Sequence, residues 1–342
     1  MSPRVVLVSP VSIDSPRGNA VTVARIARGL RSRGLDVCVQ CLDDHGLSEP
    51  APARPPALVH AFHAYRAGPL ALALSRSCGA PLVITVTGTD VSNDLRDAAR
   101  GHVVRETLLG SAAITAFHDS IAAEIAGALP AVASRLAVVP QSVPLLSAKA
   151  LGGGADVHGD PCLLFPAGIR PVKRPLLPLT SLDGLLQKHP GLRLWYAGPP
   201  LDPRETARLN EALSDRPWAR YVGAVPHSAM PALFEAADIV LNCSLSEGGM
   251  ANAVLEAFAF GRAVLASDIP GNRSLVEDGV TGLLFRSETE LGRGVEKLAA
   301  DPALRRRLGE AGRQLVASRF TPERETRGYL DVYARVTGGS LV

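Results

Sequence analysis

Short strand-like runs of apolar residues alternate with longer amphipathic segments along most of the chain. Between the first two runs, Val23, Ile26 and Leu30 recur at helical spacing inside residues 21–32. Strands that alternate with helical segments across short polar turns are typical of a parallel, doubly wound sheet. The runs of the first half lie at residues 5–8, 36–40, 58–61, 82–86, 113–116 and 136–139.

A second series of strand-like runs follows in the other half of the chain. These runs lie at residues 163–166, 192–197, 220–222, 239–242, 263–266 and 283–285. Two such series predict two Rossmann-like domains, which is an α/β fold class. Bulky residues thin out at residues 145–160, which include a glycine triplet at 152–154, and we place the linker there. The predicted domains are residues 1–150 and residues 151–320.

The last part of the chain reads as helical and polar. Asp301 followed by Pro302 is typical of a helix start, with Asp as the cap and Pro at the first helical position. Residues 322–336 have the pattern of one last helix. We assign residues 321–342 to a C-terminal helix that returns to the N-terminal domain.

Composition and charge narrow the class of function. The chain has 342 residues, of which 46% are hydrophobic, and its 36 basic and 33 acidic residues leave a net charge of +3. Such a small basic excess argues against a nucleic-acid-binding protein. No apolar run approaches the roughly 18 residues of a membrane-spanning helix, and the first strand begins too early to leave room for a signal peptide. We expect a cytoplasmic protein.

The cysteines do not suggest redox or metal chemistry. Cys38 and Cys41 form a CxxC, but they lie in a strand-like run, where residues three apart point to opposite faces. A redox pair would favour a helix N-terminus. We interpret both residues as structural thiols.

The most informative stretch is residues 246–258, which follow the strand at 239–242. It reads as a strand, a turn with Gly248 and Gly249, and a helix that starts near Met250. A helix start after such a turn presents backbone N–H groups and the positive end of a dipole, which suits a phosphate. Glu247 on the loop and Glu256 in the helix could then meet the hydroxyls of a sugar and a ribose. The alternative is an ordinary turn and a solvated helix face.

A basic loop follows the first strand of the second half. Arg170 and Lys173 lie at the carboxyl end of that strand, where open α/β sheets bind ligands. Two cations there can neutralise a diphosphate, and Arg offers it a fork of donors. Alone, such a loop would more often be solvated. Together with the phosphate-binding helix start in the same half, it favours a nucleotide-diphosphate site.

Polar residues also follow strands in the first half. Gly18 and Asn19 connect the first strand to the first helix, and Gly18 would let the backbone approach a ligand. The loop is not a GxGxxG, so a nicotinamide or flavin fingerprint is absent there. Thr87 and Asp90 follow another strand.

Three histidines lie at or near strand ends in this half, and each could be a core residue. Their spacing does not form a metal site. They are His60, His63 and His118.

Together these residues resemble the retaining GT-B glycosyltransferases of family 4, the glycosyl transferases group 1 domain, over nearly the whole chain. The most specific segments are residues 246–257 (SEGGMANAVLEA), 263–272 (AVLASDIPGN) and 276–285 (VEDGVTGLLF). The resemblance implies two Rossmann-like domains that face a cleft.

Within that family the chain looks closest to the glycosyltransferase 1 domain-containing branch. The shared segments are residues 18–22 (GNAVT), 63–66 (HAYR), 88–91 (GTDV) and 170–173 (RPVK). The first and third segments are also similar to bacterial selenosugar synthases, which residues 276–285 fit less well.

The resemblance implies a role for each donor-side residue. Arg170 and Lys173 would bind the donor diphosphate and stabilise the leaving nucleotide. Glu256 would hold the ribose and Glu247 the sugar. The resemblance implies no metal and no cofactor, with a UDP-sugar as co-substrate. The backbone N–H groups that would cradle the phosphates belong to Met250, Ala251 and Asn252, with Gly248 and Gly249 in the turn and Gly18 and Asn19 approaching from the other domain.

Three departures from the family pattern concern the sugar and acceptor side. Glu247 and Glu256 are nine positions apart, whereas eight is usual. Thr87 stands where many relatives carry histidine, so a histidine contact to the sugar would come from His118 or His63, or be missing. Gln141 and Ser142 stand where Asn-Gly is common, which indicates a specialised acceptor loop.

The sequence therefore predicts a retaining transferase that moves glucose or N-acetylglucosamine from a UDP-sugar to a small-molecule or glycan acceptor. The alternatives are a selenosugar- or thiosugar-forming transferase, a GT-B nucleotide-sugar epimerase and a non-catalytic sensor. Peripheral membrane contact is a separate possibility. The alternative is that the same helix face is simply solvated. It would use the arginines of the first helix, Arg25, Arg28, Arg31 and Arg33.

Overall fold

The computed structural model describes residues 3–15, 18–43, 46–47, 54–144, 157–339 and 341. They form two compact units. The N-terminal unit comprises Met1–Ser142 with Pro322–Val342, and the C-terminal unit comprises Val143–Thr321. Most of the linker predicted at 145–160 lies outside the described residues, and the division of the chain falls a few residues before it.

The N-terminal unit is built on a seven-stranded sheet with the order β3-β2-β1-β4-β5-β6-β7. Its strands run parallel except β3, a two-residue antiparallel addition to β2 that the sequence pattern did not predict. All six strands predicted in this half are confirmed. The bounds are β1 (Arg4–Ser9), β2 (Asp36–Asp43), β3 (Gly46–Leu47), β4 (Leu58–Phe62), β5 (Leu82–Thr85), β6 (Ala113–Ala116) and β7 (Leu136–Val138).

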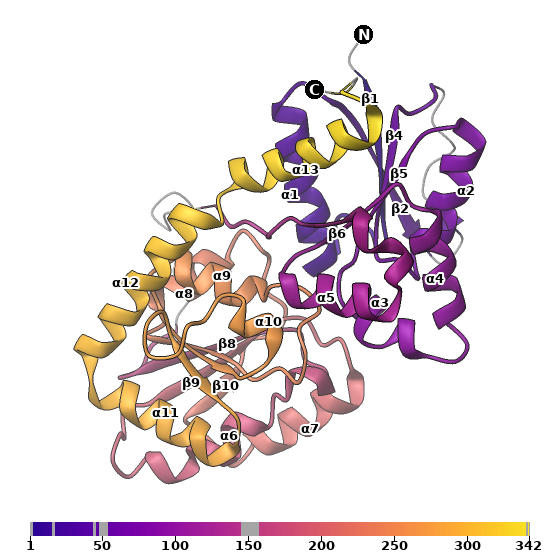
Figure 1. Ribbon diagram of the computed structural model, residues 1–342. Coiled ribbons are helices and arrows are strands. Elements are labelled where there is room, and N and C mark those ends of the chain that lie inside the picture. The colour runs from indigo at the N-terminus through magenta and orange to yellow at the C-terminus, as the bar shows by residue number, and fades with distance from the viewer. Residues whose placement is uncertain are drawn as a thin grey trace. The chain divides into compact units, whose positions relative to one another are not determined.

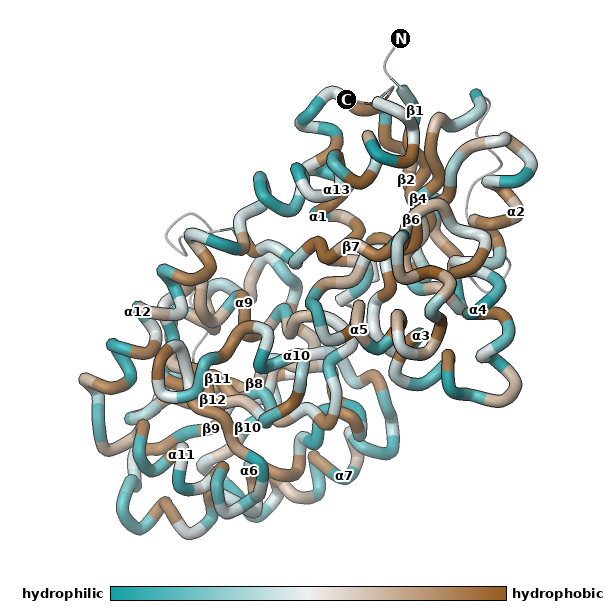
Figure 2. The backbone as a smooth tube through the Cα atoms, viewed as in Figure 1, coloured by the Kyte–Doolittle hydropathy of each residue, from teal (hydrophilic) through white to brown (hydrophobic). Residues whose placement is uncertain are grey.

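Helices cover both faces of this sheet, because successive side chains of a strand point to opposite faces. In β1, Val5 and Leu7 pack with apolar residues of α1 and α13, whereas Val6 and Val8 pack with those of α2, α4 and α5. Figure 2 shows the apolar strands at the centre of the unit. The helices are α1 (Gly18–Ser32), α2 (Gly68–Cys78), α3 (Thr89–Ser92), α4 (Gly101–Gly110), α5 (Asp119–Ala128) and α13 (Pro322–Thr337), with the 3₁₀ turns η1 (Asp94–Arg96) and η2 (Pro130–Arg135).

The C-terminal helix α13 packs beside α1 in the N-terminal unit (Figure 1). Glu325 accepts two hydrogen bonds from the Arg25 guanidinium, at 2.8 and 2.9 Å, and one from the Ser142 hydroxyl at 2.6 Å. Glu325 is buried, so removal of Arg25 would leave a buried charge without its counter-ion. Arg31 donates to the Val37 carbonyl at 2.9 Å. Two of the four arginines proposed to meet a membrane therefore have partners within the unit.

The C-terminal unit contains a six-stranded parallel sheet with the order β10-β9-β8-β11-β12-β13. All six strands predicted in this half are confirmed. Both halves thus form the doubly wound α/β sheets that the pattern predicted. The bounds are β8 (Cys162–Pro166), β9 (Arg193–Ala197), β10 (Ala219–Tyr221), β11 (Ile239–Asn242), β12 (Ala263–Ser267) and β13 (Leu283–Phe285).

Helices also flank the second sheet. The carboxylate of Asp301 accepts from the Leu304 amide at 2.9 Å, which confirms the predicted cap of α12. The elements are α6 (Leu177–Leu182), α7 (Pro203–Leu213), α8 (Met230–Ala236), α9 (Asn252–Ala259), α10 (Pro270–Arg273), α11 (Glu288–Ala300) and α12 (Pro302–Arg319), with η4 (Pro171–Lys173) and η5 (Asp183–Leu185).

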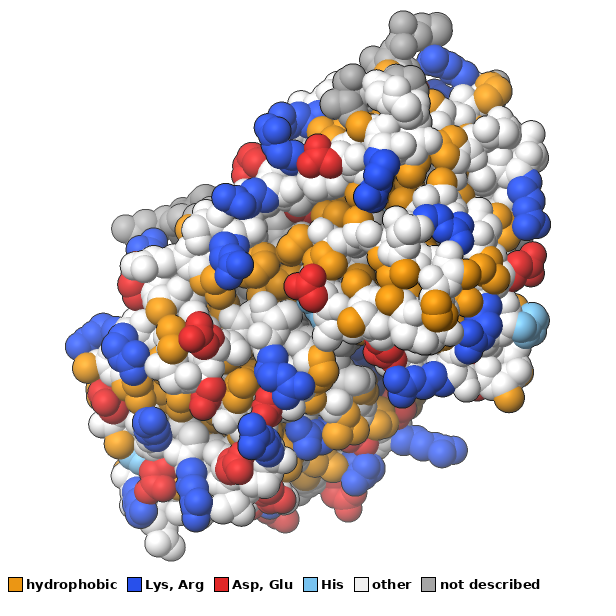
Figure 3. Space-filling model, viewed as in Figure 1, with side chains coloured by type: hydrophobic (Ala, Val, Ile, Leu, Met, Phe, Trp, Pro, Cys, Tyr) orange, Lys and Arg blue, Asp and Glu red, His pale blue; other side chains and the backbone are white. Residues whose placement is uncertain are grey.

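Basic and acidic side chains are interspersed on the face seen in Figure 3, in keeping with the small net charge. Within the described residues, no helix combines the length and the apolar character that crossing a membrane requires. Cys38 and Cys41 lie in β2, half-buried and buried respectively, so the predicted strand environment of the CxxC is confirmed.

Candidate functional site

The order of the C-terminal sheet reverses between β8 and β11, which are neighbours although they are far apart in sequence. Open α/β sheets bind ligands outside the carboxyl ends of the strands at such a switch point. Arg170 and Lys173 lie in the segment after β8, and Glu247 lies in the segment after β11. The tertiary structure therefore places the basic loop and the segment that carries Glu247 at the carboxyl ends of two neighbouring strands.

The two loops are joined by one backbone hydrogen bond and one hydrogen bond from a side chain. The Leu245 amide donates to the Val172 carbonyl at 2.8 Å, and the Arg174 guanidinium donates to the Cys243 carbonyl at 2.6 Å. Arg174 adopts a left-handed backbone with φ of 49°. This conformation is uncommon for a residue with a side chain. Arg174 was not predicted from the sequence, and it fixes the geometry around Lys173.

Lys173 and Glu247 form a largely buried ion pair at this edge. Their side chains are only 14% and 13% exposed. The Lys173 ammonium also donates to the Ser244 hydroxyl at 3.2 Å. Glu247 Oε1 accepts further hydrogen bonds from the Ser244 hydroxyl at 2.6 Å and from the Asn242 amide at 3.2 Å. The ammonium, a hydroxyl and an amide thus converge on a single carboxylate oxygen.

The pKa of Glu247 follows from two opposing effects. Burial raises it, because a charge is disfavoured away from water. The Lys173 charge and the hydrogen bonds from Lys173, Ser244 and Asn242 outweigh burial and hold the pKa of Glu247 below its ordinary value. Glu247 is therefore an anion at neutral pH, and Lys173 has a negative charge beside it.

A second set of polar residues positions Ser244, which contacts both Lys173 and Glu247. Asn242 Oδ1 accepts from the Ser244 amide at 3.1 Å, and the Ser267 hydroxyl donates to the Ser244 carbonyl at 2.6 Å. Asn272 in turn donates to the Ser267 carbonyl at 2.9 Å. We did not predict these residues. Their positions at the ends of β11 and β12 were the available signal, but serine and asparagine are common in turns.

The glycine-bearing turn leads into α9 two residues later than predicted. Asn252 is its first residue, because Ala251 has an extended backbone with φ of −68° and ψ of 107°. The turn is packed closely against α10. A Cβ at Gly271 would come within 2.8 Å of the Gly249 carbonyl and 2.7 Å of the Glu247 side chain. The helix still offers first-turn N–H groups that have no acceptor inside the helix.

The remaining predicted residues of this half have different surroundings. Arg170 is exposed at the end of the β8 loop. Met250 is buried, with 5% of its surface exposed. Glu256 lies in α9, where its carboxylate contacts His227 Nε2 at 3.0 Å. His227 was not predicted, and it lies in a polar segment between β10 and α8 that carries no motif.

The N-terminal sheet reverses its order between β1 and β4. Gly18 and Asn19 are the first residues of α1, which follows β1. The residues directly before Gly18 lie outside the described residues. His63 follows β4, and Thr87 and Asp90 follow β5. The predicted polar residues of this half therefore also gather at the carboxyl ends of strands.

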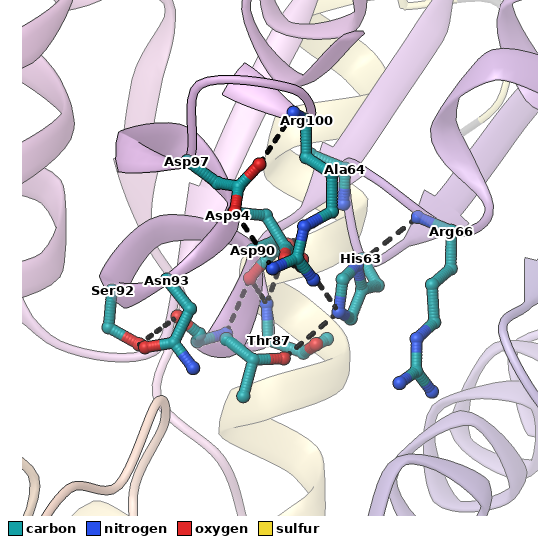
Figure 4. Close-up of polar contacts among 12 residues, drawn as sticks. His63, Ala64, Arg66, Thr87, Asp90, Ser92, Asn93, Asp94, Asp97 and Arg100 are labelled. Atoms are coloured by element: carbon teal, nitrogen blue, oxygen red, sulfur yellow. Dashed lines mark hydrogen bonds and ion pairs between the residues drawn. The ribbon is translucent and has the colours of Figure 1, made fainter.

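Asp90, predicted to lie on the sugar or acceptor side, is fully buried and binds backbone amides. Its carboxylate accepts from Ala64 N at 2.8 Å, from Thr87 N at 3.1 Å and from Gly88 N at 2.6 Å. Figure 4 shows this carboxylate between the loops that follow β4 and β5. These contacts hold the two loops together, so they give Asp90 a structural part in the site.

His63 is buried in the same cluster and both of its ring nitrogens have partners. Nε2 contacts the Thr89 hydroxyl at 3.0 Å, and Nδ1 accepts from the Arg66 amide at 3.3 Å. Burial lowers the pKa of His63. The Arg66 charge adds to that effect, and Asp90 and Asp94 oppose it. His63 also has a positive φ of 79°, which places it among the strained residues that cluster at functional sites.

The other predicted polar residues of this half differ in their positions and hydrogen-bond partners. His60 contacts the Tyr333 hydroxyl and the Thr85 hydroxyl, each at 2.6 Å, and burial lowers its pKa to about 3. It is a core histidine. Gln141 is buried, and its amide donates to the Thr22 hydroxyl of α1 at 3.1 Å. His118 begins α5 as its cap residue after β6.

Comparison with known proteins bears on the C-terminal unit most directly. The family described as Glycosyl transferases group 1 matches residues 154–315. Over more of the chain, glycosyltransferase 1 domain-containing protein 1 of Xenopus tropicalis is 27% identical across 327 residues, which is 91% of this chain and 92% of that protein.

Solved structures share the architecture of both units. A glycosyltransferase from Rickettsia africae superposes with a TM-score of 0.79 at 14% identity, covering 99% of this chain and 100% of that one. Anabaena Alr3699/HepE in complex with UDP-glucose also gives a TM-score of 0.79, at 16% identity, over 98% of this chain and 99% of that one. At such low identity these matches show the fold, which is GT-B.

Proposed function

We propose that this chain, a glycosyltransferase of the GT-B type, transfers glucose or N-acetylglucosamine from a UDP-sugar with retention at the anomeric carbon. The observation that carries the proposal is the buried Lys173–Glu247 pair at the switch point, with the exposed Arg170 on the same loop as Lys173. One structural neighbour, Anabaena Alr3699/HepE, is known in complex with UDP-glucose, which supports a nucleotide sugar as the donor.

Charge on the departing diphosphate is the main demand of this reaction. The bond between the anomeric carbon and the β-phosphate oxygen breaks, and its electron pair leaves on UDP. Arg170 and Lys173 supply positive charge where that negative charge develops, with Arg170 offering a planar fork of donors. The acceptor nucleophile bonds to the anomeric carbon on the same face, and its proton passes to the departing phosphate oxygen.

The contacts of Glu247 separate the work of its two carboxylate oxygens. Within the described part of the chain, Lys173, Ser244 and Asn242 all contact Oε1 of this carboxylate. Oε2 is therefore the atom that can accept a hydrogen bond from a hydroxyl of the donor sugar. Oε1 holds the Lys173 ammonium in place before the diphosphate arrives.

The helix α9 would hold the rest of the nucleotide. The backbone at Met250, Ala251 and Asn252 leads into its first turn, where N–H groups and the helix dipole favour phosphate oxygens. Glu256, one turn further along, would accept hydrogen bonds from the ribose hydroxyls. In this proposal the reaction needs no metal and no cofactor, because the two cations and the helix start neutralise the diphosphate.

A panel of nucleotide sugars tests the proposal, read out by melting temperature and by release of the nucleotide. At a concentration of about 100 times its Kd, a true donor adds roughly 2.7 kcal/mol to the stability of the folded state. We expect a UDP-hexose to do so, and to release UDP when alcohols, glycans or selenophosphate are offered as acceptors.

Matched variants complete this experiment. Arg170→Ala and Glu256→Ala should weaken donor binding. Lys188→Ala should not, because Lys188 forms an exposed ion pair with Glu296 just before the amino end of β9, at the opposite edge of the sheet. Interconversion of two sugars without net UDP release would show an epimerase instead. A melting shift without turnover under any acceptor would show a sensor.

A further inference from the structure

A cavity of about 140 Å³ lies in the C-terminal unit at the amino ends of β9 and β10. The candidate donor site lies at the carboxyl ends of β8 and β11, so the cavity is at the opposite end of the strands. Among the described residues that line it there is no carboxylate. The side chains that line it include those of His158, Arg193, Trp195, Pro217, Trp218 and Arg220.

The register of the sheet brings two arginines to one face of its edge. β10 is the outermost strand of the sheet, and Arg220 lies opposite Trp195 of β9. Arg193 precedes Trp195 by two residues, and residues two apart in a strand share a face. With strands about 4.8 Å apart and a rise of about 3.3 Å per residue, the Cα atoms of Arg193 and Arg220 are about 8 Å apart. Two guanidinium groups from neighbouring strands therefore reach the same space.

These two arginines are not neutralised by the protein. Within the described part of the chain, neither Arg193 nor Arg220 forms an ion pair, and the Arg220 side chain is exposed. Nη1 of Arg193 donates to the carbonyls of Pro190 and Leu192, at 2.9 and 2.7 Å. A guanidinium carries five N–H donors, so these bonds fix its position and leave Nε and Nη2 for a ligand.

The wall of the cavity is closely packed. The Trp195 indole donates to the His158 carbonyl at 2.9 Å, and the two rings meet edge to face with their centroids 5.7 Å apart. A Cβ at Gly159 would lie 2.8 Å from the Cβ of Arg193 and 3.0 Å from the Pro161 carbonyl. The segment before β8 therefore holds both the indole and the stem of Arg193 in place.

Charge and size select the kind of ligand. Two cations without a counter-ion favour an anion, and the planar fork of a guanidinium matches phosphate oxygens. Forks on two strands can take different oxygens of one tetrahedral group, whereas a carboxylate offers only two oxygens in a plane. A cavity of about 150 Å³ holds a benzene molecule, so this one has room for a phosphoryl group with a few carbon atoms but not for a nucleotide.

We propose that this cavity binds a phosphoryl group, either as the free phosphate anion or on a small phosphate monoester. Arg193 and Arg220 bind its oxygens, and Pro217 and the indole rings contact the carbon atoms of an ester. The inference does not depend on the proposed glycosyl transfer, because no residue that lines the cavity belongs to the candidate donor site.

Tryptophan fluorescence reports this cavity directly, because the chain has two tryptophans and both line it. The full chain is titrated with sodium phosphate and with glycerol 3-phosphate at constant ionic strength. Sodium chloride and glycerol serve as controls for charge and for the carbon part. We expect a saturable change in emission with both phosphate compounds and none with either control.

Arg220→Gln is the decisive variant, because the side chain has no contact within the described residues that folding could lose. It should raise the Kd for both compounds roughly ten- to 100-fold, the effect of one lost hydrogen bond between charged groups. The melting temperature of the ligand-free protein should stay the same. Arg220→Lys keeps the charge without the fork and should fall between the two. Arg293→Gln, at an exposed arginine of α11, should match the wild type.

Arg193→Gln should weaken binding as strongly as Arg220→Gln. It should also lower the melting temperature, because Arg193 holds two backbone carbonyls. Arg170→Gln separates the cavity from the candidate donor site, which would also attract phosphate. The fluorescence titration of this variant should be the same as that of the wild type.

The two phosphate compounds identify the source of the phosphoryl group. Tighter binding of glycerol 3-phosphate would show a site for an ester, and equal or weaker binding would show a site for the free anion. The site is overturned by a change in emission no larger than that with chloride, by a Kd of Arg220→Gln within twofold of the wild type, or by loss of the signal in Arg170→Gln. A wild type that binds phosphate here but no nucleotide sugar would overturn the proposed function alone.

Discussion

The carboxyl ends of the two sheets carry different kinds of polar group, although both sheets are doubly wound. At the C-terminal sheet, a lysine and a glutamate neutralise each other in a largely buried pair. At the N-terminal sheet, the buried carboxylate of Asp90 is used on backbone amides, and the groups left without a partner among the described residues are uncharged. The described residues of the C-terminal unit thus pair a lysine with a glutamate at this position, whereas those of the N-terminal unit direct a buried carboxylate to backbone amides.

This contrast matches what the two halves of a glycosyl transfer require. A diphosphate leaving group needs fixed positive charge. A largely buried cation is stable before the diphosphate binds only if a counter-ion pairs with it. Hydroxyl groups of a sugar or an acceptor are neutral, and buried neutral donors and acceptors discriminate them well, because a ligand without the hydroxyl leaves those groups unpaired. In the proposed transfer, this difference would assign charge stabilisation to the C-terminal unit.

The largest expected effect comes from removing the Lys173 cation of the C-terminal unit. Lys173→Ala should lower kcat/KM roughly 100- to 1,000-fold, the usual cost of losing one charge contact to a developing anion. It should also destabilise the C-terminal unit by about 3 kcal/mol, since Glu247 is left as a buried charge without its counter-ion. Denaturation followed by tryptophan fluorescence reports this unit, because both tryptophans, Trp195 and Trp218, lie in it.

A double variant separates these two losses. Adding Glu247→Gln to Lys173→Ala should recover most of the stability and none of the activity, because the unpaired charge is gone but the cation is still missing. Lys188→Ala, at an exposed pair, should stay within about 0.5 kcal/mol of the wild type. Recovery of activity in the double variant would contradict the role given to Lys173.

The second effect tests whether Asp90 is structural. Asp90→Ala leaves the amides of Ala64, Thr87 and Gly88 without their acceptor. We expect a loss of about 3 kcal/mol in urea denaturation followed by far-UV circular dichroism, the cost of unpaired buried donors and a lost charged acceptor. Asp97→Ala, at a half-buried carboxylate in the same region, should cost much less. If Asp90→Ala kept full stability but lost transfer activity, Asp90 would be a ligand-binding residue and not a structural one.

The smallest expected effect is a change in how the stability of the protein depends on pH, through the buried His60 of the N-terminal unit. Burial lowers the pKa of His60 from 6.5 to about 3, so the unfolded chain binds a proton at a pH where the folded one does not. Stability is therefore complete above about pH 6.5 and falls as the pH drops towards 3. Between about pH 7 and pH 5 the loss from His60 is about 2 kcal/mol.

The variant His60→Gln checks this directly. It should lose about 2 kcal/mol less than the wild type over the same pH interval in urea denaturation. The lowered pKa values of His63 and His118 act in the same direction and remain in both proteins. Equal pH dependence of the two proteins would mean that the pKa of His60 is not lowered in the folded state.

Much of the fold could be predicted because the hydrophobic pattern is local. Twelve predicted strands are confirmed, and Asp301 caps α12 as its sequence indicates. The pattern missed β3, because a two-residue antiparallel strand carries no periodicity. It also placed the start of α9 two residues early. The turn before this helix packs closely against Gly271, a contact that no local signal encodes.

The sequence by itself determined the fold class and the residue types of the candidate donor site, since strand ends, a glycine-bearing turn and paired cations can be recognised from neighbours in the chain. Only the tertiary structure decided which atoms meet. It brought Lys173 to Glu247 across 74 positions and directed Asp90 to backbone amides. It also left His118 Nε2, unlike the ring nitrogens of His60 and His63, without a partner among the described residues. These outcomes depend on loops that different strands bring together, and a hydrogen bond forms only where that packing places a donor beside an acceptor.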